Sequence, residues 1–291
     1  MKKTHTAAIL LSGFFWGIIG LFTRHLSALG VSSAGILILR SGGCCLLFGL
    51  TLLFKEPEQF RIKLKDLWLF LCFGILATFF FTFSYYRAIE LADISVACTL
   101  MYTAPVFVTL MSLVLFRESF TARKLAALCL AVLGCALVSG LAEGGSANGQ
   151  GILFGLFAGF GYALYSIFSK LLSRRGYDVF QINFYGWLFC SLMGLALWGF
   201  APAAPALQSL PGGLYAAGLI VISGFLPSLL YNRALGSVEA SKAAMMVSIE
   251  PVVASLTGIL AFGESLSLSA GLGVLLVLSA VLLVNAPAKT K

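Results

Sequence analysis

The chain has 291 residues, of which 60% are hydrophobic and 10% are charged, and its formal net charge is +8. Soluble domains carry about 25% charged residues. A soluble fold is excluded because it has no way to keep this much apolar surface out of water. We therefore predict a multi-pass membrane protein, in which the basic charge reflects loop topology and not nucleic-acid binding.

Ten apolar runs are long enough to span a bilayer, and short connections with Gly, Pro, Ser or charged residues separate them. The predicted helices are 6–23, 33–54, 67–86, 95–116, 122–141, 150–172, 178–200, 212–231, 241–262 and 267–286. The first run follows basic residues and resembles a signal peptide. No small-residue cleavage site closes it before Arg24, so we interpret it as the first membrane helix.

The second half of the chain repeats the first at a spacing of 146 residues. The correspondence pairs Arg87 with Arg233, Pro105 with Pro251 and Glu118 with Glu264. The predicted units are residues 1–145 and 146–291, each with five helices. Because five is odd, the second unit enters the membrane from the opposite side. This is the inverted repeat of many secondary transporters.

The Lys and Arg residues predict the orientation. If the N-terminus is cytoplasmic, all of the 19 Lys and Arg residues except Arg24, Arg40 and Arg87 fall in cytoplasmic segments. This distribution follows the positive-inside rule. We therefore expect a multi-pass protein of the cell membrane with both termini in the cytoplasm.

Small residues recur at four-residue spacing in two of the predicted helices. The positions are Gly13 and Gly17 in the first helix and Gly151, Gly155 and Gly159 in the sixth. Such spacing lets helix backbones approach closely, so it predicts helix packing. Trp16 and Tyr162 lie beside these small faces and are candidates to line a cavity between the repeats.

Catalytic and metal-binding motifs are absent from the sequence. All 7 Cys lie in apolar runs without ligand spacing, so we interpret them as structural residues. No His lies within a predicted span, and Asp66, Asp93 and Asp178 all lie near helix ends. The sequence therefore predicts no enzyme activity, no metal and no cofactor.

Four motifs along the chain carry a resemblance to a known family. They are Ser-Gly-x-x-Trp-Gly at 12–17, Leu39-Arg40, Pro105 followed by Phe-Arg-Glu-Ser at 116–119, and Ile249-Glu250-Pro251 followed by Phe-Gly-Glu-Ser at 262–265. In this order, and at the repeat spacing, they resemble the EamA-type transporters of the drug/metabolite transporter superfamily. The resemblance implies two five-helix bundles around a central cavity that works by alternating access. It also implies small organic substrates, often exported.

Glu250 is the charged residue closest to the middle of a predicted span. A charge in hydrocarbon costs roughly 2.5–3.5 kcal/mol on insertion scales, so it marks function by default. Pro251 predicts a kink beside it. The carboxyl group is a candidate for cation binding and proton coupling, because burial disfavours its charged form; the alternative is a protonated Glu bonded to a neighbouring helix. The first repeat has Ala104-Pro105 at the equivalent place. The kink is therefore expected in both repeats, whereas the carboxylate is specific to the second.

Several other residues are candidates for binding, gating or anchoring. The predicted substrate-binding residues are Trp16, Tyr102, Tyr162, Asn183, Tyr185 and Glu250, and Tyr102 and Ser248 are expected to face one cavity. Arg40 attracts a substrate anion, snorkels outward or pairs with Glu90 or Asp93; we favour a gating or structural role for it, as for Pro105 and Pro251. We expect Tyr86 and Tyr231 to be interfacial anchors. Glu118 and Glu264 are expected to cap the N-terminus of the next helix.

The sequence as a whole predicts a secondary active transporter, an exporter or exchanger of amino acids, amines or organic cations. Aromatic residues beside one carboxylate suit an organic cation, whereas a Glu and an Arg together suit a zwitterion. The expected partners are a small-molecule substrate, protons or a counter-substrate, and the lipid bilayer, in a monomer or homodimer without nucleic acid. The alternatives are a membrane receptor or structural protein without transport, and an intramembrane enzyme.

Overall fold

The computed structural model describes residues 3–55, 57–92, 94–143, 148–263, 265 and 267–286. Its α-helices are α1 Lys3–Gly17, α2 Ile19–Ala28, α3 Ser33–Lys55, α4 Leu67–Leu71, α5 Phe80–Leu91, α6 Ile94–Met101, α7 Ala104–Leu115, α8 Ala122–Val138, α9 Gly149–Arg174, α10 Val179–Trp198, α11 Leu210–Ile220, α12 Leu226–Leu235, α13 Ala240–Val247, α14 Glu250–Phe262 and α15 Leu268–Asn285. Short helical turns join or extend several of these helices.

The helices in the described part of the chain are those of a multi-pass membrane protein. It contains 9 helical stretches that are long and apolar enough to cross a membrane. All predicted segments are helical, with ends a few residues from the predicted ones. The remaining predicted segment, 122–141, forms α8, whose 17 residues pack along α15.

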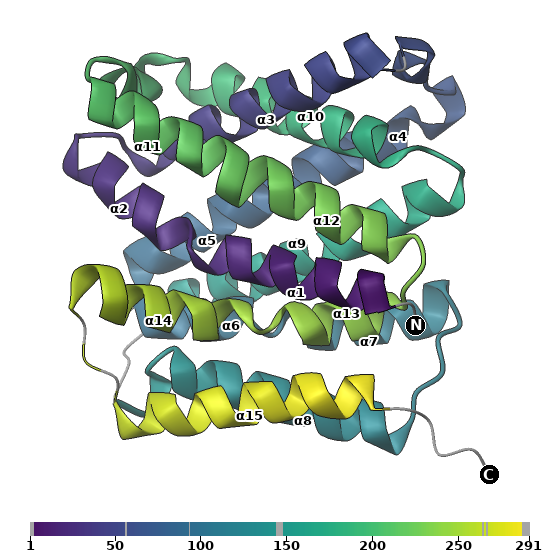
Figure 1. Cartoon of the computed structure of the whole chain (residues 1–291), viewed down its shortest axis with the longest axis vertical. Coiled ribbons are helices and arrows are strands. Elements are labelled where there is room, and N and C mark those ends of the chain that lie inside the picture. The colour runs from purple at the N-terminus through teal and green to yellow at the C-terminus, as the bar shows by residue number, and fades with distance from the viewer. Residues whose placement is uncertain are drawn as a thin grey trace.

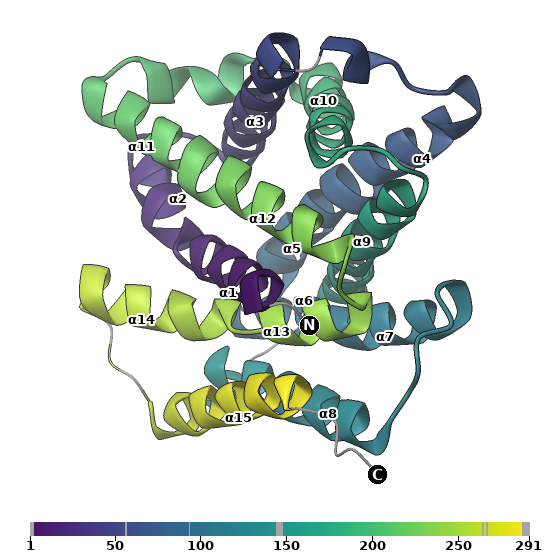
Figure 2. The same ribbon diagram turned by 45° about the vertical axis from the view of Figure 1, so that its right-hand side comes forward.

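Equivalent helices of the two repeats run in opposite directions. In Figure 2, α7 and α14 lead away from the middle of the molecule toward opposite ends. The start of α1 and the end of α15 lie at one end of the bundle, which we call the terminal end (Figure 1). The arrangement is the inverted repeat that the 146-residue spacing predicts.

The fourth and ninth predicted helices are each broken into two. The first break separates α6 from α7 at Tyr102 and Thr103, and the second separates α13 from α14 at Ser248 and Ile249. Each Pro is the second residue of the new helix, where its missing N–H costs no hydrogen bond. The kink predicted from the Pro residues is therefore a complete interruption, and Glu250 is the first residue of α14.

Glycine residues hold these breaks against the first helix of the opposite repeat. A Cβ atom on Gly17 of α1 would lie 2.7 Å from the carbonyl oxygen of Glu250. A Cβ atom on Gly159 of α9 would lie 2.7 Å from the carbonyl oxygen of Leu100. The packing role predicted from the spacing is confirmed, and each repeat supplies the support for the broken helix of the other.

Two π-helical stretches interrupt the third and eighth predicted helices at equivalent places. These are η3 (Cys72–Phe79) and η6 (Val221–Phe225), and the second corresponds to residues 75–79 of the first repeat. The wider turn of a π-helix changes which carbonyl groups are paired along the helix, and such turns are frequent at functional sites.

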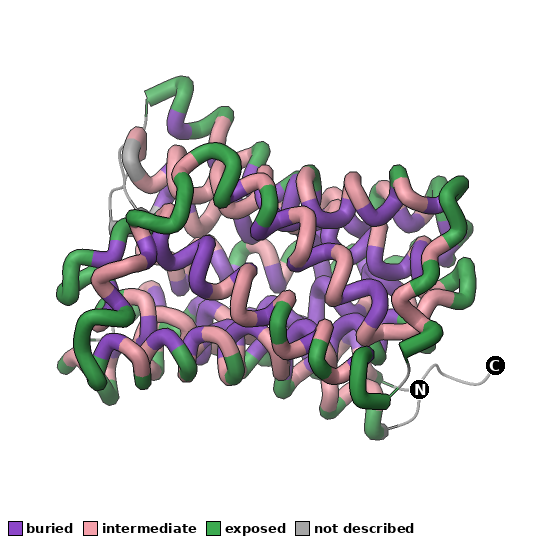
Figure 3. The backbone as a smooth tube through the Cα atoms, turned by 90° about the horizontal axis from the view of Figure 1, so that it is seen from above, coloured by how far each residue is buried: buried purple, intermediate pink, exposed green. Residues whose placement is uncertain are grey.

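The helices α8 and α15 form a separate outer layer below α7 and α14 (Figure 2). They cross at Gly134 and Gly273, where a Cβ atom on either residue would lie within 2.9 Å of the other's carbonyl oxygen. Large apolar side chains such as Leu133 and Leu282 stay exposed on this layer. Buried residues fill the middle of the bundle and exposed ones lie around it, as Figure 3 shows, so the exposed apolar side chains are suited to contact lipid.

Candidate functional site

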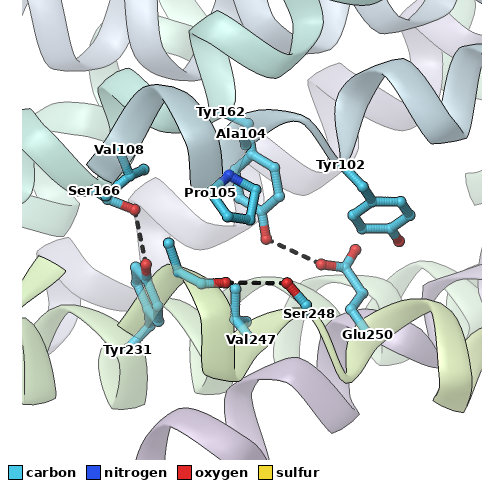
Figure 4. Close-up of a pocket in the computed structure, with 11 residues that line it drawn as sticks. Tyr102, Ala104, Pro105, Val108, Tyr162, Ser166, Tyr231, Val247, Ser248 and Glu250 are labelled. Carbon is cyan, nitrogen blue, oxygen red and sulfur yellow. Dashed lines mark hydrogen bonds between the residues drawn. The ribbon is translucent and has the colours of Figure 1, made fainter. Parts of the chain in front are cut away.

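A small cavity lies where the two helix breaks face each other (Figure 4). It is lined by Tyr102, Ala104, Pro105, Val108, Tyr162, Ser166, Tyr231, Ala244, Val247, Ser248 and Glu250. The space open to the centre of a water-sized sphere is about 10 Å³, which is room for roughly one water molecule. The cavity is therefore too small for an organic solute, which enters only if the helices around it move apart.

Glu250 is held at the edge of the cavity by its position on α14 and by one hydrogen bond. The Tyr162 hydroxyl donates to its Oε2 atom at 2.9 Å (Figure 4). As the first residue of α14, the carboxyl group lies beside the positive end of a helix dipole. The equivalent start of α7 carries Ala104, so only one half-helix brings a charge to the cavity.

Tyrosine side chains form much of the cavity wall. Tyr102 faces Glu250 from the first break, and Ser248 lies at the second break (Figure 4). The Ser166 and Tyr231 hydroxyls share a hydrogen bond of 2.7 Å. Trp16 does not line the cavity; its ring packs 6.3 Å from that of Tyr162 and 5.3 Å from that of Tyr231, so it supports the wall from behind.

The lining residues give the cavity a single sign of charge. Within the described part of the chain they include one carboxyl group, several hydroxyls and no Lys, Arg or His. Aromatic rings attract cations through the negative faces of their π systems. The arrangement favours a ligand with a positive or protonated nitrogen over one with an anionic group.

Asn183 and Tyr185 lie outside the cavity lining. The Asn183 side-chain oxygen accepts from Asn232 at 2.8 Å, in a fully buried polar cluster with Tyr165 and Ser169. The Tyr185 hydroxyl donates to the Phe60 carbonyl oxygen at 2.5 Å and ties the connection after α3 to α10. Their polar groups are thus engaged in holding helices together.

Arg40 also lies outside the cavity lining. Its Nη2 donates to the Ser223 carbonyl oxygen in η6 at 2.8 Å, and its guanidinium lies 5.4 Å from the centroid of the Trp187 ring. The side chain of Glu90 and the whole of Asp93 lie outside the described residues, so the pairing of Arg40 with them stays a prediction. The contacts that are seen join α3 to the π-helical turn of the other repeat.

Replacing Arg40 by Met tests whether its role is structural. We expect the free energy of unfolding in detergent to fall by about 1.5–3 kcal/mol, the range for a hydrogen bond from a charged group. The apparent KM of the transported solute should stay unchanged. Lys55→Met, which removes a cation 5.9 Å from the Phe180 ring, should change stability by less than about 0.5 kcal/mol. A tenfold rise in KM without loss of stability would instead make Arg40 a substrate ligand.

Tyr231 is not the interfacial anchor that the sequence predicted. It is 1% exposed, lines the cavity and bonds to Ser166. Its position at the end of an apolar run was misleading, because α12 continues to Leu235 and places Tyr231 in the interior. Ser166 was missed altogether, although it lies four residues after Tyr162 and so on the same face of α9.

A buried ionic network lies at the terminal end, between the cavity and the surface. Glu118 accepts hydrogen bonds from the backbone N–H of Ala240 at 2.7 Å and of Ser241 at 3.2 Å. Its carboxylate also accepts from the Ser241 hydroxyl at 2.5 Å and from Lys170 at 3.0 Å. The predicted cap is therefore real, but the helix it caps is α13 of the other repeat and not α8, which follows it. Its repeat mate Glu264 lies outside the described residues.

The surroundings of Glu118 make the protein sensitive to acid. Burial raises the pKa of this carboxyl group, but the hydrogen bond from Ser241 and the Lys170 ammonium outweigh burial and hold the pKa below its usual value. A lowered pKa stabilises the folded state above about pH 4.3, the value in unfolded chains, and this contribution is lost as the pH falls through the lower folded value.

We therefore expect the thermal midpoint to drop between about pH 5 and pH 3, and to drop less in Glu118→Gln. Scanning fluorimetry across this range measures both. Glu58→Gln is the control, because Glu58 is an exposed carboxylate on the connection after α3 and exposed charges contribute little to stability. An identical acid profile for Glu118→Gln and the parent would contradict the assignment.

The geometry defines a helical membrane protein with a central cavity between two inverted repeats. The family model of the EamA-like transporter family matches residues 5–140 and 149–286. The chain belongs to the EamA-like transporter family and is a membrane transporter of the drug/metabolite type.

Relatives and a solved structure match over nearly the full length of the chain. An uncharacterised transporter of Archaeoglobus fulgidus is 29% identical over 95% of this chain and 94% of its own length. The uncharacterised transporter YvbV of Bacillus subtilis is 24% identical over 100% of this chain and 95% of its own. A crystal structure with 17% identity superposes with a TM-score of 0.79 over 98% of this chain and 97% of its own, which shows the shared fold.

Proposed function

We propose that the protein is a secondary active transporter that moves small organic amines or cations by alternating access around the cavity at Glu250. The observation that supports this substrate class is a single carboxylate, bonded to Tyr162, in a cavity whose described lining holds tyrosine rings and no basic residue. Amino acids remain the second candidate from the sequence. The structure favours them less, because Arg40 is outside the lining and bonds to a backbone carbonyl.

Competition for one carboxyl group provides the coupling in this proposal. Glu250 holds either a proton or the positive charge of the substrate, since both occupy the same negative site. A proton arriving from one side then releases the substrate, and a substrate arriving from the other side releases the proton. The result is exchange of a substrate for a proton, which exports the substrate when the outside is more acidic.

The orientation in the membrane is part of the same proposal. We propose ten membrane helices, with α8 as the fifth, and both termini in the cytoplasm of a cell-membrane protein. The support is the gathering of basic residues in the segments at the terminal end, including Lys55, Lys124 and Arg175. The unit boundaries at 145 and 146 fall between the two ranges that match the family model, and a monomeric or homodimeric state remains a prediction.

Transport into proteoliposomes tests the proposal directly. Purified full-length protein is reconstituted with an acidic interior, and uptake is measured for a panel of radiolabelled amines, quaternary ammonium ions, amino acids and organic anions. We expect uptake of one or more of the cationic compounds that depends on the pH gradient and stops with a protonophore. Movement of anions alone, or of no solute under any gradient, would overturn the proposed function.

A further inference from the structure

We propose that Glu118, Lys170 and Ser241 form the gate that closes the cavity toward the terminal end. The role in the transport cycle rests on the function proposed above, whereas the bonds among the three side chains are a property of the structure. The three side chains come from three separate elements: the connection after α7, the helix α9, and the start of α13.

The gate lies in line with the cavity on α9. Tyr162 and Ser166 line the cavity, and Lys170 follows at the next four-residue step. Residues four apart lie on one face of a helix, and each step advances about 6 Å along the axis. Lys170 therefore occupies the same face of α9 as the cavity wall, one turn nearer to the terminal end.

The other two helices lead to the same point. On α13, Ala244 and Val247 line the cavity, and Ser241 lies three residues before Ala244 on the side of the terminal end. On α7, Pro105 and Val108 line the cavity, and the chain continues past Leu115 to Glu118. Residues of both repeats thus converge on one carboxylate that lies between the cavity and the terminal end.

The bonding of this carboxylate makes the gate either fully closed or open. Glu118 accepts four hydrogen bonds, and the Lys170 ammonium also donates to the Val238 carbonyl oxygen at 2.7 Å. Both side chains are nearly inaccessible, with 5% exposure for Glu118 and 8% for Lys170. A partial separation would leave two buried charges without compensation, which is strongly unfavourable. Only a movement large enough to admit water replaces the lost bonds.

The cation–aromatic contact of this arrangement has a counterpart at the opposite end. The Lys170 ammonium lies 5.2 Å from the centroid of the Phe116 ring, and the Arg24 guanidinium lies 4.6 Å from that of Phe262. Lys170 is 146 residues after Arg24, and Phe262 is 146 residues after Phe116. Each end therefore carries a cation over an aromatic ring at the place where the cavity would open.

A second buried carboxylate at the terminal end provides a matched control. Asp66 pairs with Arg175 and accepts from the Tyr177 hydroxyl at 2.7 Å. Like that of Glu118, its side chain is nearly inaccessible, with 3% exposure, whereas its partner Arg175 is 44% exposed. The Asp66 side chain joins the start of α4 to the turn after α9, and neither Arg175 nor Tyr177 lines the cavity. Loss of the Asp66 pair should therefore loosen the structure without opening the cavity.

The test measures access to the cavity and needs no substrate. Ser166→Cys places a thiol in the cavity wall of the otherwise unchanged full-length protein. Membrane vesicles of both orientations are treated with a membrane-impermeant maleimide, and mass spectrometry gives the labelling rate of the peptide with position 166. Protease access to a C-terminal tag identifies the membrane face at which the termini lie.

We expect Glu118→Gln to raise the labelling rate from the terminal face by about tenfold or more, because removing one partner of a buried charge pair shifts the closing equilibrium by at least that factor. Asp66→Asn should leave the rate within about twofold of the parent. If Glu118→Gln is not monodisperse, Ser241→Ala, which deletes one hydrogen bond, should still raise the rate severalfold.

An unchanged rate in the folded gate variants, or an equal rise in Asp66→Asn, overturns the gate. Failure of all solute uptake with faster labelling would overturn the transport proposal and leave the gate standing.

Discussion

Replacing Glu250 by Gln is expected to reduce gradient-driven cation uptake by about 100-fold or more. Truncating one partner of a buried charge interaction typically costs 2–5 kcal/mol or more, and each 1.4 kcal/mol is a factor of ten. Gln has the shape of Glu and still accepts from the Tyr162 hydroxyl, so the fold and the thermal midpoint should be retained. The remaining uptake should no longer respond to the pH gradient, because Gln carries no exchangeable proton at this site.

Two variants separate the charge of Glu250 from its hydrogen bond. Tyr162→Phe removes the donor at 2.9 Å but keeps the carboxyl group. It should lower uptake by only about three- to tenfold, the effect of one hydrogen bond of about 0.5–1.5 kcal/mol. Glu58→Gln removes an exposed carboxylate on the connection after α3 and should leave uptake unchanged. Uptake by Glu250→Gln that keeps its full dependence on the pH gradient would refute proton coupling through this residue.

Adding a single methyl group at Gly17 or Gly159 should destabilise the protein strongly. A Cβ atom at either position would lie 2.7 Å from a backbone carbonyl oxygen of the opposite repeat. A side chain could rotate away from such a contact, but a backbone atom cannot. Overpacking of this kind typically costs about 1–3 kcal/mol. We therefore expect Gly17→Ala and Gly159→Ala to lower the thermal midpoint in detergent by several degrees.

Two other glycine residues, Gly20 in α2 and Gly149 in α9, are natural controls. A Cβ atom on Gly20 or on Gly149 meets nothing within 4 Å. Ala is the better helix former by roughly 0.5–1 kcal/mol, so Gly20→Ala should keep or raise the midpoint. Since Gly17 touches the backbone of Glu250, Gly17→Ala should also reduce transport more than its loss of stability alone explains. Equal midpoints for Gly17→Ala and Gly20→Ala would contradict the close approach.

Much of the fold follows from three features of the sequence. The apolar runs fix the helices, because a chain in hydrocarbon must satisfy its backbone groups within each helix. The 146-residue spacing of Pro105 and Pro251 predicts that the two helices interrupted by these residues are equivalent, and the structure breaks both at equivalent residues. Small residues at four-residue spacing predict which faces pack closely, and Gly17 and Gly159 are found at such contacts.

The partners of individual polar groups were harder to predict. Glu118 was expected to cap the helix that follows it, because sequence proximity was the only guide; the helix it does cap begins 122 residues later at Ala240. Arg40 was considered as an anion ligand, a snorkelling side chain or a partner of outer-loop carboxylates that lie outside the described residues. Its described hydrogen bond is to a backbone carbonyl of a π-helical turn, which no local sequence pattern predicts. Such pairings depend on how whole helices cross, which a single sequence does not specify.

Trp16 makes the closed cavity visible to spectroscopy. Its indole is 7% exposed and packs edge-on against Tyr162 and Tyr165 and at a tilt against Tyr231. Two of these rings line the cavity, so any ligand or water that separates them changes the surroundings of the indole. Replacing Trp68, Trp187 and Trp198 with Phe leaves Trp16 as the single fluorescent indole. Shifts in its emission wavelength would then report the filling of the cavity in real time without an added label.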